Sequence, residues 1–296
     1  MKRLYLLACC VCLTFFHLSL SAQLLYQISG NGARAKSYLF ATNALVAPEF
    51  LDTIPKTYAA FSTCNKVITE FAIQDYQAIA ALRTAALLPD SVRLSDFYTD
   101  EEYQELSEAL SLQIGLPMSQ LARMKPAYLQ GLFRDALFAQ WLGSTPEASV
   151  ETFFQNIALT KDIPVYALDD TGEALYMLFD REPFQWQCEE LLKMTRYPER
   201  EIRQARQLKA LYLNGFINEI AYAIEAPDNK ASIAYSDYKI WTDRNRGWVK
   251  RLQPYLQDGR AFITLKAEYL GGDDGLIAQL RAAGYKLKPI RHTQVQ

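Results

Sequence analysis

Acidic side chains follow three of the apolar runs of this sequence. Glu70 lies near the end of Lys66–Phe71, Asp169 follows Ile163–Leu168, and Glu268 follows Ala261–Lys266. Open α/β sheets gather their ligands at the carboxyl ends of strands. Carboxylates placed there could hold a hard cation such as Mg²⁺ or Mn²⁺ for hydrolysis. Two structural alternatives stay open: a buried Glu70 paired with an arginine, and Asp169 capping a helix together with Asp170.

A second polar group lies on a predicted helix, residues 236–256. Its apolar stripe contains Ile240, Trp248 and Leu252, and Asn245 falls on the same face. A buried amide needs hydrogen-bond partners, and a buried carboxylate needs a counter-charge. We therefore expect Arg244 to pair with Glu70 at the floor of a cleft. Asn245 either lines that cleft or ties down a loop.

Four short motifs carry a resemblance to a known family. They are Asp243-Arg244-Asn245, Thr42 with Ala41 and Ala44, Glu70 with Ala72, and Lys266 through Tyr269. Together they resemble the acidic-Arg-Asn, Gly-Thr-x-His, Glu-x-Asp and Gly-x-x-His motifs of the TraB/GumN family. Relative to that family, Ala44 and Tyr269 stand where histidines are usual. Lys266 replaces the glycine and would partly fill the cleft. Asn43, beside the lost histidine, either caps a strand-to-helix turn or lies in the cleft.

The resemblance implies a fold shared with ChaN and erythromycin-esterase proteins. It also implies a divalent metal and hydrolysis like that of the metal-dependent Tiki proteases. Because both histidines are replaced, we expect no metal and no other cofactor. The site residues expected by resemblance are Glu70, Arg244 and Asn245, with Asn43, Asp169, Glu268 and Tyr269 as further cleft candidates.

The residues that could do chemistry depend on a framework of short strands and longer helices. β-Rich runs occur at 24–29, 37–42, 66–71, 163–168, 261–266 and 285–290, and helical spacing at 74–115, 147–158, 173–195, 199–225 and 236–256. Gly30-Asn31-Gly32 predicts a hairpin between the first two strands. The pattern favours an α/β fold with a modest mixed sheet covered by helices, and a helical insert over Gln74–Ala158.

The N-terminus is typical of a secretory signal peptide. Lys2 and Arg3 precede an apolar run to Leu20, and small residues follow to Ala22. The sequence thus predicts a signal over 1–22 and one domain over 23–296, exported to the periplasm, the envelope or the medium. Without Lys2 and Arg3 the formal charge falls from −2 to −4, which disfavours a nucleic-acid partner. No stable membrane span is expected after cleavage.

Two cysteines, Cys64 and Cys188, remain after cleavage and could form an intramolecular disulfide in an oxidising compartment. His292 is then the one histidine left, too far into the tail to complete a Ser-His-acid triad. The favoured interpretation is a pseudoenzyme that binds a peptide or an envelope protein. The alternatives are a divergent metal-dependent hydrolase or peptidase that uses carboxylate ligands, and an assembly factor that binds through its helical insert.

Overall fold

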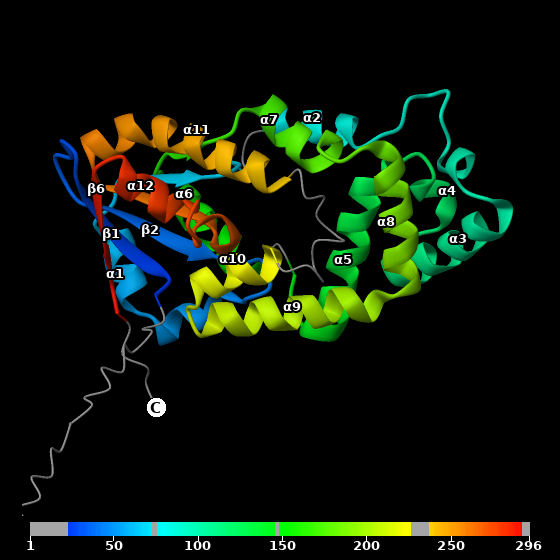
Figure 1. Ribbon diagram of the computed structural model, residues 1–296, viewed down its shortest axis with the longest axis horizontal. Coiled ribbons are helices and arrows are strands. Elements are labelled where there is room, and N and C mark those ends of the chain that lie inside the picture. The colour runs from blue at the N-terminus through cyan, green and yellow to red at the C-terminus, as the bar shows by residue number, and fades with distance from the viewer. Residues whose placement is uncertain (1–22, 73–75, 146–147, 226–236, 292–296) are drawn as a thin grey trace, which may run out of the picture.

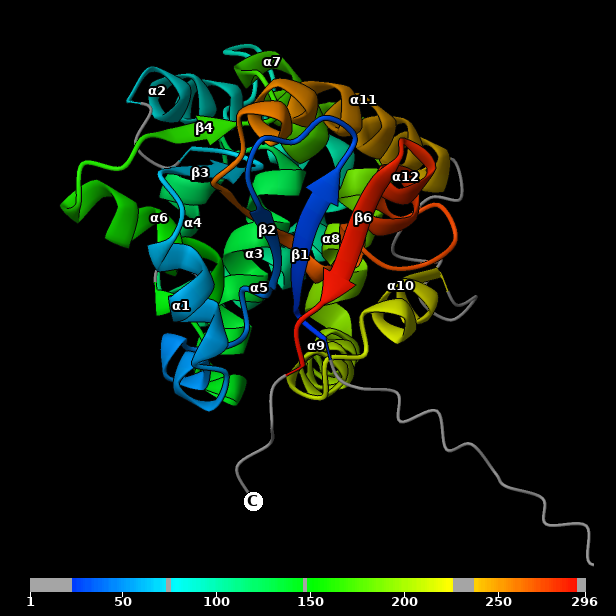
Figure 2. The ribbon, with the colours of Figure 1, turned by 90° about the vertical axis from the view of Figure 1, so that its left-hand side faces the viewer.

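The computed structural model describes residues 23–72, 76–145, 148–225 and 237–291 and contains one mixed sheet. Its strands are β1 (Leu25–Gly30), β2 (Ser37–Thr42), β3 (Lys66–Thr69), β4 (Val165–Ala167), β5 (Ala261–Lys266) and β6 (Tyr285–Pro289). They are ordered β4-β3-β5-β2-β1-β6 (Figure 2). The four strands from β4 to β2 are parallel, whereas β1 is antiparallel to both β2 and β6. All six predicted strands are present.

The predicted hairpin is confirmed. β1 pairs antiparallel with β2, and the turn contains Gly30, Asn31 and Gly32 at φ values of 84°, 47° and 77°. Glycine adopts positive φ without steric cost, and asparagine tolerates it better than most residues. The Asn31 side chain also donates to the carbonyl of Ala283 at 2.9 Å. This contact ties the hairpin to the turn that precedes β6.

Helices surround the sheet and extend beyond it. They are α1 (Lys56–Ser62), α2 (Tyr76–Ala85), α3 (Asp100–Ile114), α4 (Met118–Leu121), α5 (Pro126–Leu142), α6 (Val150–Thr160), α7 (Thr171–Leu175), α8 (Phe184–Arg196), α9 (Pro198–Leu213), α10 (Ile217–Glu225), α11 (Asp237–Asp258) and α12 (Leu276–Ala282), with short 3₁₀ turns η1 (Pro48–Thr53), η2 (Leu94–Phe97) and η5 (Ala267–Tyr269) and a π-helical turn η4 (Tyr176–Asp180). Figure 1 shows a sheet lobe and a helical lobe, with α9 running from one to the other.

Each lobe has its own hydrophobic core. In the sheet lobe α1 and α6 pack on one side of the sheet and α11 and α12 on the other (Figure 2). Phe154 of α6 packs its ring against Phe40, Phe61 and Phe262, with centroids 4.7–5.6 Å apart. The second core lies between α3, α4, α5 and α8, where Leu106, Leu129 and Leu191 are fully buried. The described part of the predicted single domain, 23–296, therefore contains two hydrophobic cores.

The predicted helical insert needs correction at its end. Its helix α6 packs on β3, β4 and β5 and belongs to the sheet lobe. By contrast α8, which follows β4 in the chain, completes the helical lobe through contacts with α3 and α5. The long helical stretches are also interrupted, at Pro89, at Pro183 and at Gly215 with φ 67°. Proline and positive-φ glycine both end helices.

The disulfide that the sequence left possible between Cys64 and Cys188 is absent from the structure. Cys64 and Cys188 are free thiols, because Cys64 packs against the core of the sheet lobe whereas Cys188 is buried on α8 in the helical lobe.

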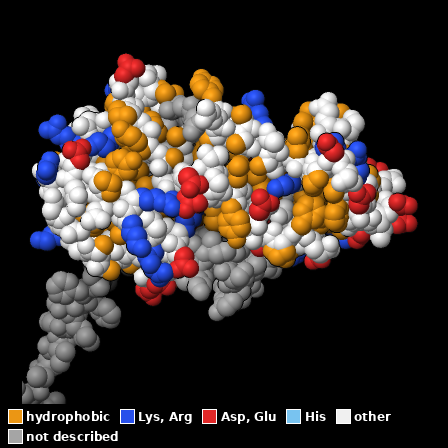
Figure 3. All heavy atoms as spheres, turned by 90° about the horizontal axis from the view of Figure 1, so that it is seen from above, with side chains coloured by type: hydrophobic (Ala, Val, Ile, Leu, Met, Phe, Trp, Pro, Cys, Tyr) orange, Lys and Arg blue, Asp and Glu red, His pale blue; other side chains and the backbone are white. Residues whose placement is uncertain are grey.

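The predicted signal peptide and His292 lie outside the described residues. Among the described helices, none combines the length and the apolar character that a membrane span requires. Figure 3 shows that acidic and basic side chains are interspersed on the face seen there.

Candidate functional site

The carboxyl ends of β2, β3, β4 and β5 meet at one edge of the sheet. The parallel register aligns Thr42 with Lys266, and Thr69 with both Ala167 and Thr264. Beyond the last strand pairs, the backbone N–H of Asp169 donates to the carbonyl of Glu70 at 3.3 Å. Strand pairing therefore fixes the two predicted acidic residues side by side.

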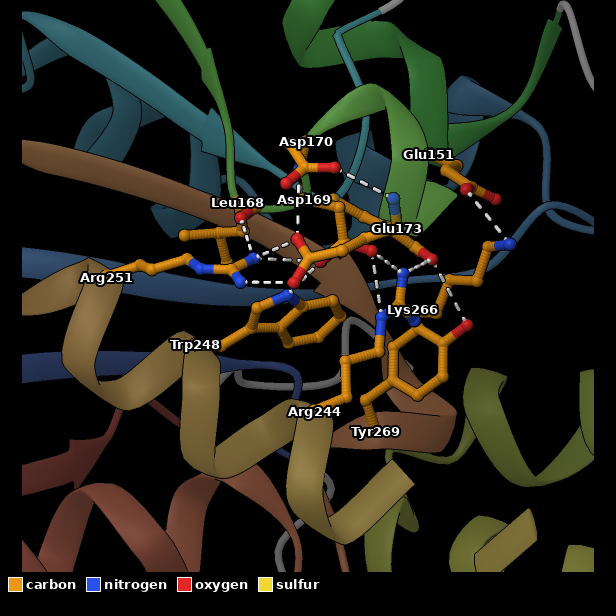
Figure 4. A network of polar contacts seen from close by, with 11 residues as sticks. Glu151, Leu168, Asp169, Asp170, Glu173, Arg244, Trp248, Arg251, Lys266 and Tyr269 are labelled. Atoms are coloured by element: carbon orange, nitrogen blue, oxygen red, sulfur yellow. Dashed lines mark hydrogen bonds and ion pairs between the residues drawn. The ribbon is translucent and has the colours of Figure 1, made fainter. Parts of the chain in front are cut away.

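Arg244 of α11 links these two carboxylates. Its Nε donates to Asp169 Oδ2 at 2.9 Å, and its Nη2 donates both to Asp169 Oδ2 and to Glu70 Oε1. The indole N–H of Trp248, one helical turn further on, donates to the other oxygen of Asp169. Figure 4 shows Arg244 and Trp248 of α11 converging on Asp169, which follows β4. The predicted Glu70–Arg244 pair is thus confirmed, with Asp169 as a third member that the sequence left undecided.

Two aromatic rings hold the guanidinium in place. The Arg244 Cζ atom lies 4.3 Å from the ring centroid of Trp248 and 5.2 Å from that of Tyr269. The two rings are themselves edge-to-face at 5.4 Å. Cations over aromatic faces gain about 0.5–2 kcal/mol, more when they are desolvated. Tyr269, which stands where the resemblance led us to expect a histidine, also donates its hydroxyl to Glu70 at 3.4 Å, so its side chain completes the ion-pair cluster.

A cavity of about 240 Å³ opens beside this cluster. It is lined by Thr69, Glu70, Phe71, Glu151, Thr152, Gln155, Ala174, Met177, Leu178, Arg181, Arg244, Lys266 and Tyr269. We call it the sheet-edge cavity. The Lys266 ammonium lies 3.6 Å from a carboxylate oxygen of Glu151, and Figure 4 shows this pair beside the Tyr269 ring. Lys266, which is expected to fill part of the cleft, therefore lines the cavity without closing it.

Burial and neighbouring charges shift the pKa values of the ionisable groups in and beside the cavity. Burial alone would raise the pKa of Glu70, but Lys266 and Arg244 hold it below its usual range. Nearly complete burial raises the pKa of Asp169 despite Arg244, and burial raises that of Glu151 despite Lys266. Glu151 and Glu70 in turn raise the pKa of Lys266 well above its usual value. Lys266 and Arg244 are therefore permanent cations at neutral pH.

Two other predicted residues have structural roles. Asn43 is largely buried and its Oδ1 accepts from the backbone N–H of Leu45 at 2.8 Å, which is the predicted turn-capping role. Asn245 donates to the carbonyl of Tyr269 at 3.0 Å and so ties α11 to η5. Neither side chain lines the sheet-edge cavity, and neither does Glu268.

The capping alternative for Asp169 is wrong. The residue that caps α7 is Asp170, whose side chain accepts from the backbone N–H of Glu173 at 2.8 Å. Glu173 closes the capping box and also pairs with Arg251 of α11. Asp169, one residue earlier, pairs with Arg244 instead.

Sequence reasoning missed the cavity residues that come from helices. Glu151 and Gln155 project from α6, and Met177 and Leu178 from the π-helical turn η4. Gln155 donates to Thr69 Oγ1 at 3.2 Å and fixes α6 to the end of β3. Only the i, i+4 spacing of Glu151 and Gln155 gives a local signal, and it is shared by many solvent-exposed helix faces. π-Helical turns often occur at functional sites.

The sequence profile of the TraB/PrgY/gumN family matches residues 24–289, nearly the whole chain. The chain belongs to this family. Neither the comparison with curated proteins nor that with solved structures gives a match. The matched range contains every strand and every residue of the sheet-edge cavity. The resemblance inferred from the four short motifs is thereby confirmed.

The residues present do not fit the divalent metal that the family resemblance implies. Ala44 has no donor atom, and the Tyr269 hydroxyl is bonded to Glu70. The carboxylates of Glu70 and Asp169, which could coordinate a cation, are both bound by Arg244. Within the described ranges, no three His, Cys, Asp or Glu side chains gather in a way that could hold an ion. A guanidinium occupies the position between the two carboxylates.

Proposed function

We propose that this family member is exported and binds a peptide segment of a partner protein in the sheet-edge cavity, without metal-dependent hydrolysis. The observation that carries this proposal is the Arg244 cluster. Arg244 pairs with Glu70 and Asp169, Arg251 lies 3.6 Å from Asp169, and a space of about 240 Å³ beside the cluster stays open. The cluster is a fixed framework for recognition, because its charges are already compensated.

The lining of the cavity supports a peptide as the ligand. Glu70 and Glu151 supply acceptors, and Lys266 supplies donors. Met177 and Leu178 add an apolar wall, and the thioether of methionine adapts to varied side chains. A peptide offers amide groups, charges of either sign and apolar side chains. Pockets with an apolar lining and a few placed polar groups are typical of specific binding.

Selection of displayed random peptides on the mature chain tests the binding. Leu178, half exposed at the cavity, is changed to Trp to narrow the space, and the matched control is Leu159→Trp on the exposed side of α6. We expect peptides enriched on the wild type to lose at least tenfold in affinity for Leu178→Trp and to keep it for Leu159→Trp. Equal affinity for both variants would place the binding elsewhere and defeat the proposal.

Elemental analysis and metal titration test the absence of metallohydrolase chemistry. The mature chain is expected to bind neither Zn²⁺ nor Mn²⁺ with micromolar or tighter affinity. One tightly bound equivalent that supports cleavage of the selected peptides would favour the alternative, a hydrolase with carboxylate ligands. Export is tested by N-terminal sequencing, for which we expect a start near Ala22 or Gln23. A membrane-bound chain that keeps Met1 would contradict it.

A further inference from the structure

The helical lobe contains a second depression, which shares no residue with the sheet-edge cavity. It has a volume of about 610 Å³ and is lined by Gln113, Leu137, Gln140, Trp141, Pro198, Glu199, Ile202, Arg203 and Arg206. These residues come from α3, α5 and α9, and α9 runs across the lower side of α5 (Figure 1). We call this depression the α5–α9 groove.

The groove has an apolar floor and an aromatic rim. Leu137 of α5 is 2 % exposed and belongs to the core of the helical lobe, and Ile202 of α9 packs against the same core. Trp141, one helical turn after Leu137, is 54 % exposed. Gln113 donates to Gln140 at 3.0 Å and ties the end of α3 to this wall. An exposed tryptophan beside a pocket is the residue type most enriched at binding hot spots.

The α9 wall of the groove contributes two arginines that have no charged partner in the part of the chain that the structure describes. Arg203 and Arg206 are exposed, and neither has an ion pair or a side-chain hydrogen bond among the described residues. Two other arginines of the helical lobe do form ion pairs: Arg196 with Glu105 at 2.8 Å, and Arg134 with Glu201 at 2.7 Å. With Glu199 the lining carries two cations and one anion, on a chain of formal charge −2. The groove is thus a basic site on an acidic protein.

We propose that the α5–α9 groove binds an acidic amphipathic helix of a partner protein. An apolar side chain of that helix packs over Leu137 and Ile202 against the Trp141 ring, and two carboxylates meet Arg203 and Arg206. Arginine binds carboxylates in a bidentate manner, and an amphipathic helix in an apolar groove is a common mode of recognition. Because Arg203 and Arg206 are three residues apart on one helix, the two carboxylates lie one turn apart on the partner.

The test uses the mature chain and a library of displayed sixteen-residue peptides. The consensus peptide is synthesised with a fluorophore, and its affinity is measured by anisotropy. We expect one apolar anchor and two acidic residues three or four positions apart. Trp141→Ala and the pair Arg203→Glu with Arg206→Glu should each weaken binding at least tenfold. The matched control, Lys161→Glu with Lys250→Glu, reverses two exposed lysines outside the groove and should change affinity less than twofold.

Three results would overturn the proposal. The first is a consensus without acidic residues, and the second is equal weakening by the groove pair and the control pair. The third is concentration-dependent self-association that Trp141→Ala abolishes, since the groove would then hold a second copy of this chain. Circular dichroism of each variant keeps the comparison interpretable, because Trp141, Arg203 and Arg206 are exposed and their replacement should leave the helical signal unchanged.

Discussion

Replacing Arg244 by methionine tests whether the ion-pair cluster holds the sheet edge together. Methionine keeps the apolar contact with the rings of Trp248 and Tyr269 but removes the cation that hydrogen-bonds both carboxylates. The side chain of Asp169 is only 1 % exposed, and that of Glu70 is 21 % exposed. Removing one partner of a buried pair costs about 3–5 kcal/mol. At roughly 2–4 °C per kcal/mol for a chain of this size, the melting temperature should fall by roughly 6–20 °C.

Other variants separate the members of the cluster. Glu70→Gln should cost only about 1–2 kcal/mol, because Arg244 keeps Asp169. The surface control Arg246→Met removes an exposed pair with Asp243 and should cost at most about 1 kcal/mol. Adding Glu70→Gln and Asp169→Asn to Arg244→Met should recover part of the loss, since no uncompensated charge remains.

The pH dependence of the Arg244→Met variant has a definite sign. In the wild type Lys266 and Arg244 hold the pKa of Glu70 below its usual value. The stabilisation from Glu70 is therefore complete above the unfolded pKa and is lost as the pH falls through the folded pKa. The gap in unfolding free energy between wild type and Arg244→Met should be smaller at pH 4 than at pH 7 in urea unfolding. A gap below about 1 kcal/mol at pH 7 would refute the reasoning.

Three further predictions concern Glu268, the two thiols and the missing histidines. Burial raises the pKa of Glu268, so its ionisation lowers stability as the pH rises from the usual pKa through the folded one. The free energy of unfolding of Glu268→Gln, measured in urea, should therefore exceed that of the wild type by more at pH 7 than at pH 4. Cys64 and Cys188 are free thiols whose pKa values are raised by burial to about 11. In the mature chain, without Cys9, Cys10 and Cys12, two thiols should react with a maleimide after unfolding in the absence of reductant, and neither should react quickly before unfolding. The mass of a chain with an internal disulfide would contradict this. Finally, Ala44→His with Tyr269→His and Lys266→Gly should raise the affinity for Zn²⁺ in calorimetry, and unchanged affinity would show that the motifs are misaligned.

The sheet and one ion pair could be predicted from the sequence because each left a local signal. The β-rich runs are short and bounded by turn residues, and Gly30-Asn31-Gly32 specifies its turn through positive φ. The Glu70–Arg244 pair followed from electrostatics, since a carboxylate at a strand end and an arginine beside a buried stripe each require a counter-charge.

Other parts of the site had no such signal. Asp169 and Asp170 are adjacent and chemically identical. Which of them caps α7 therefore depends on the residue at which β4 ends and α7 begins. Met177 and Leu178 line the cavity because of a π-helical turn, and its pattern in the sequence resembles that of an ordinary helix. The boundary between the two lobes depends on long-range packing of α6 and α8, which periodicity does not encode.

The order of the strands also constrains when this chain can fold. β5 lies between β3 and β2 at the centre of the sheet, and β6 pairs with β1. A chain emerging from the ribosome exposes β1, β2 and β3 long before residues 261–289 have been synthesised. Until then β2 and β3 lack the strand that joins them, and such sequence-distant pairing slows folding. The sheet is therefore completed only once residues 261–289 are available, and truncation before Ala261 should leave the N-terminal strands prone to aggregation.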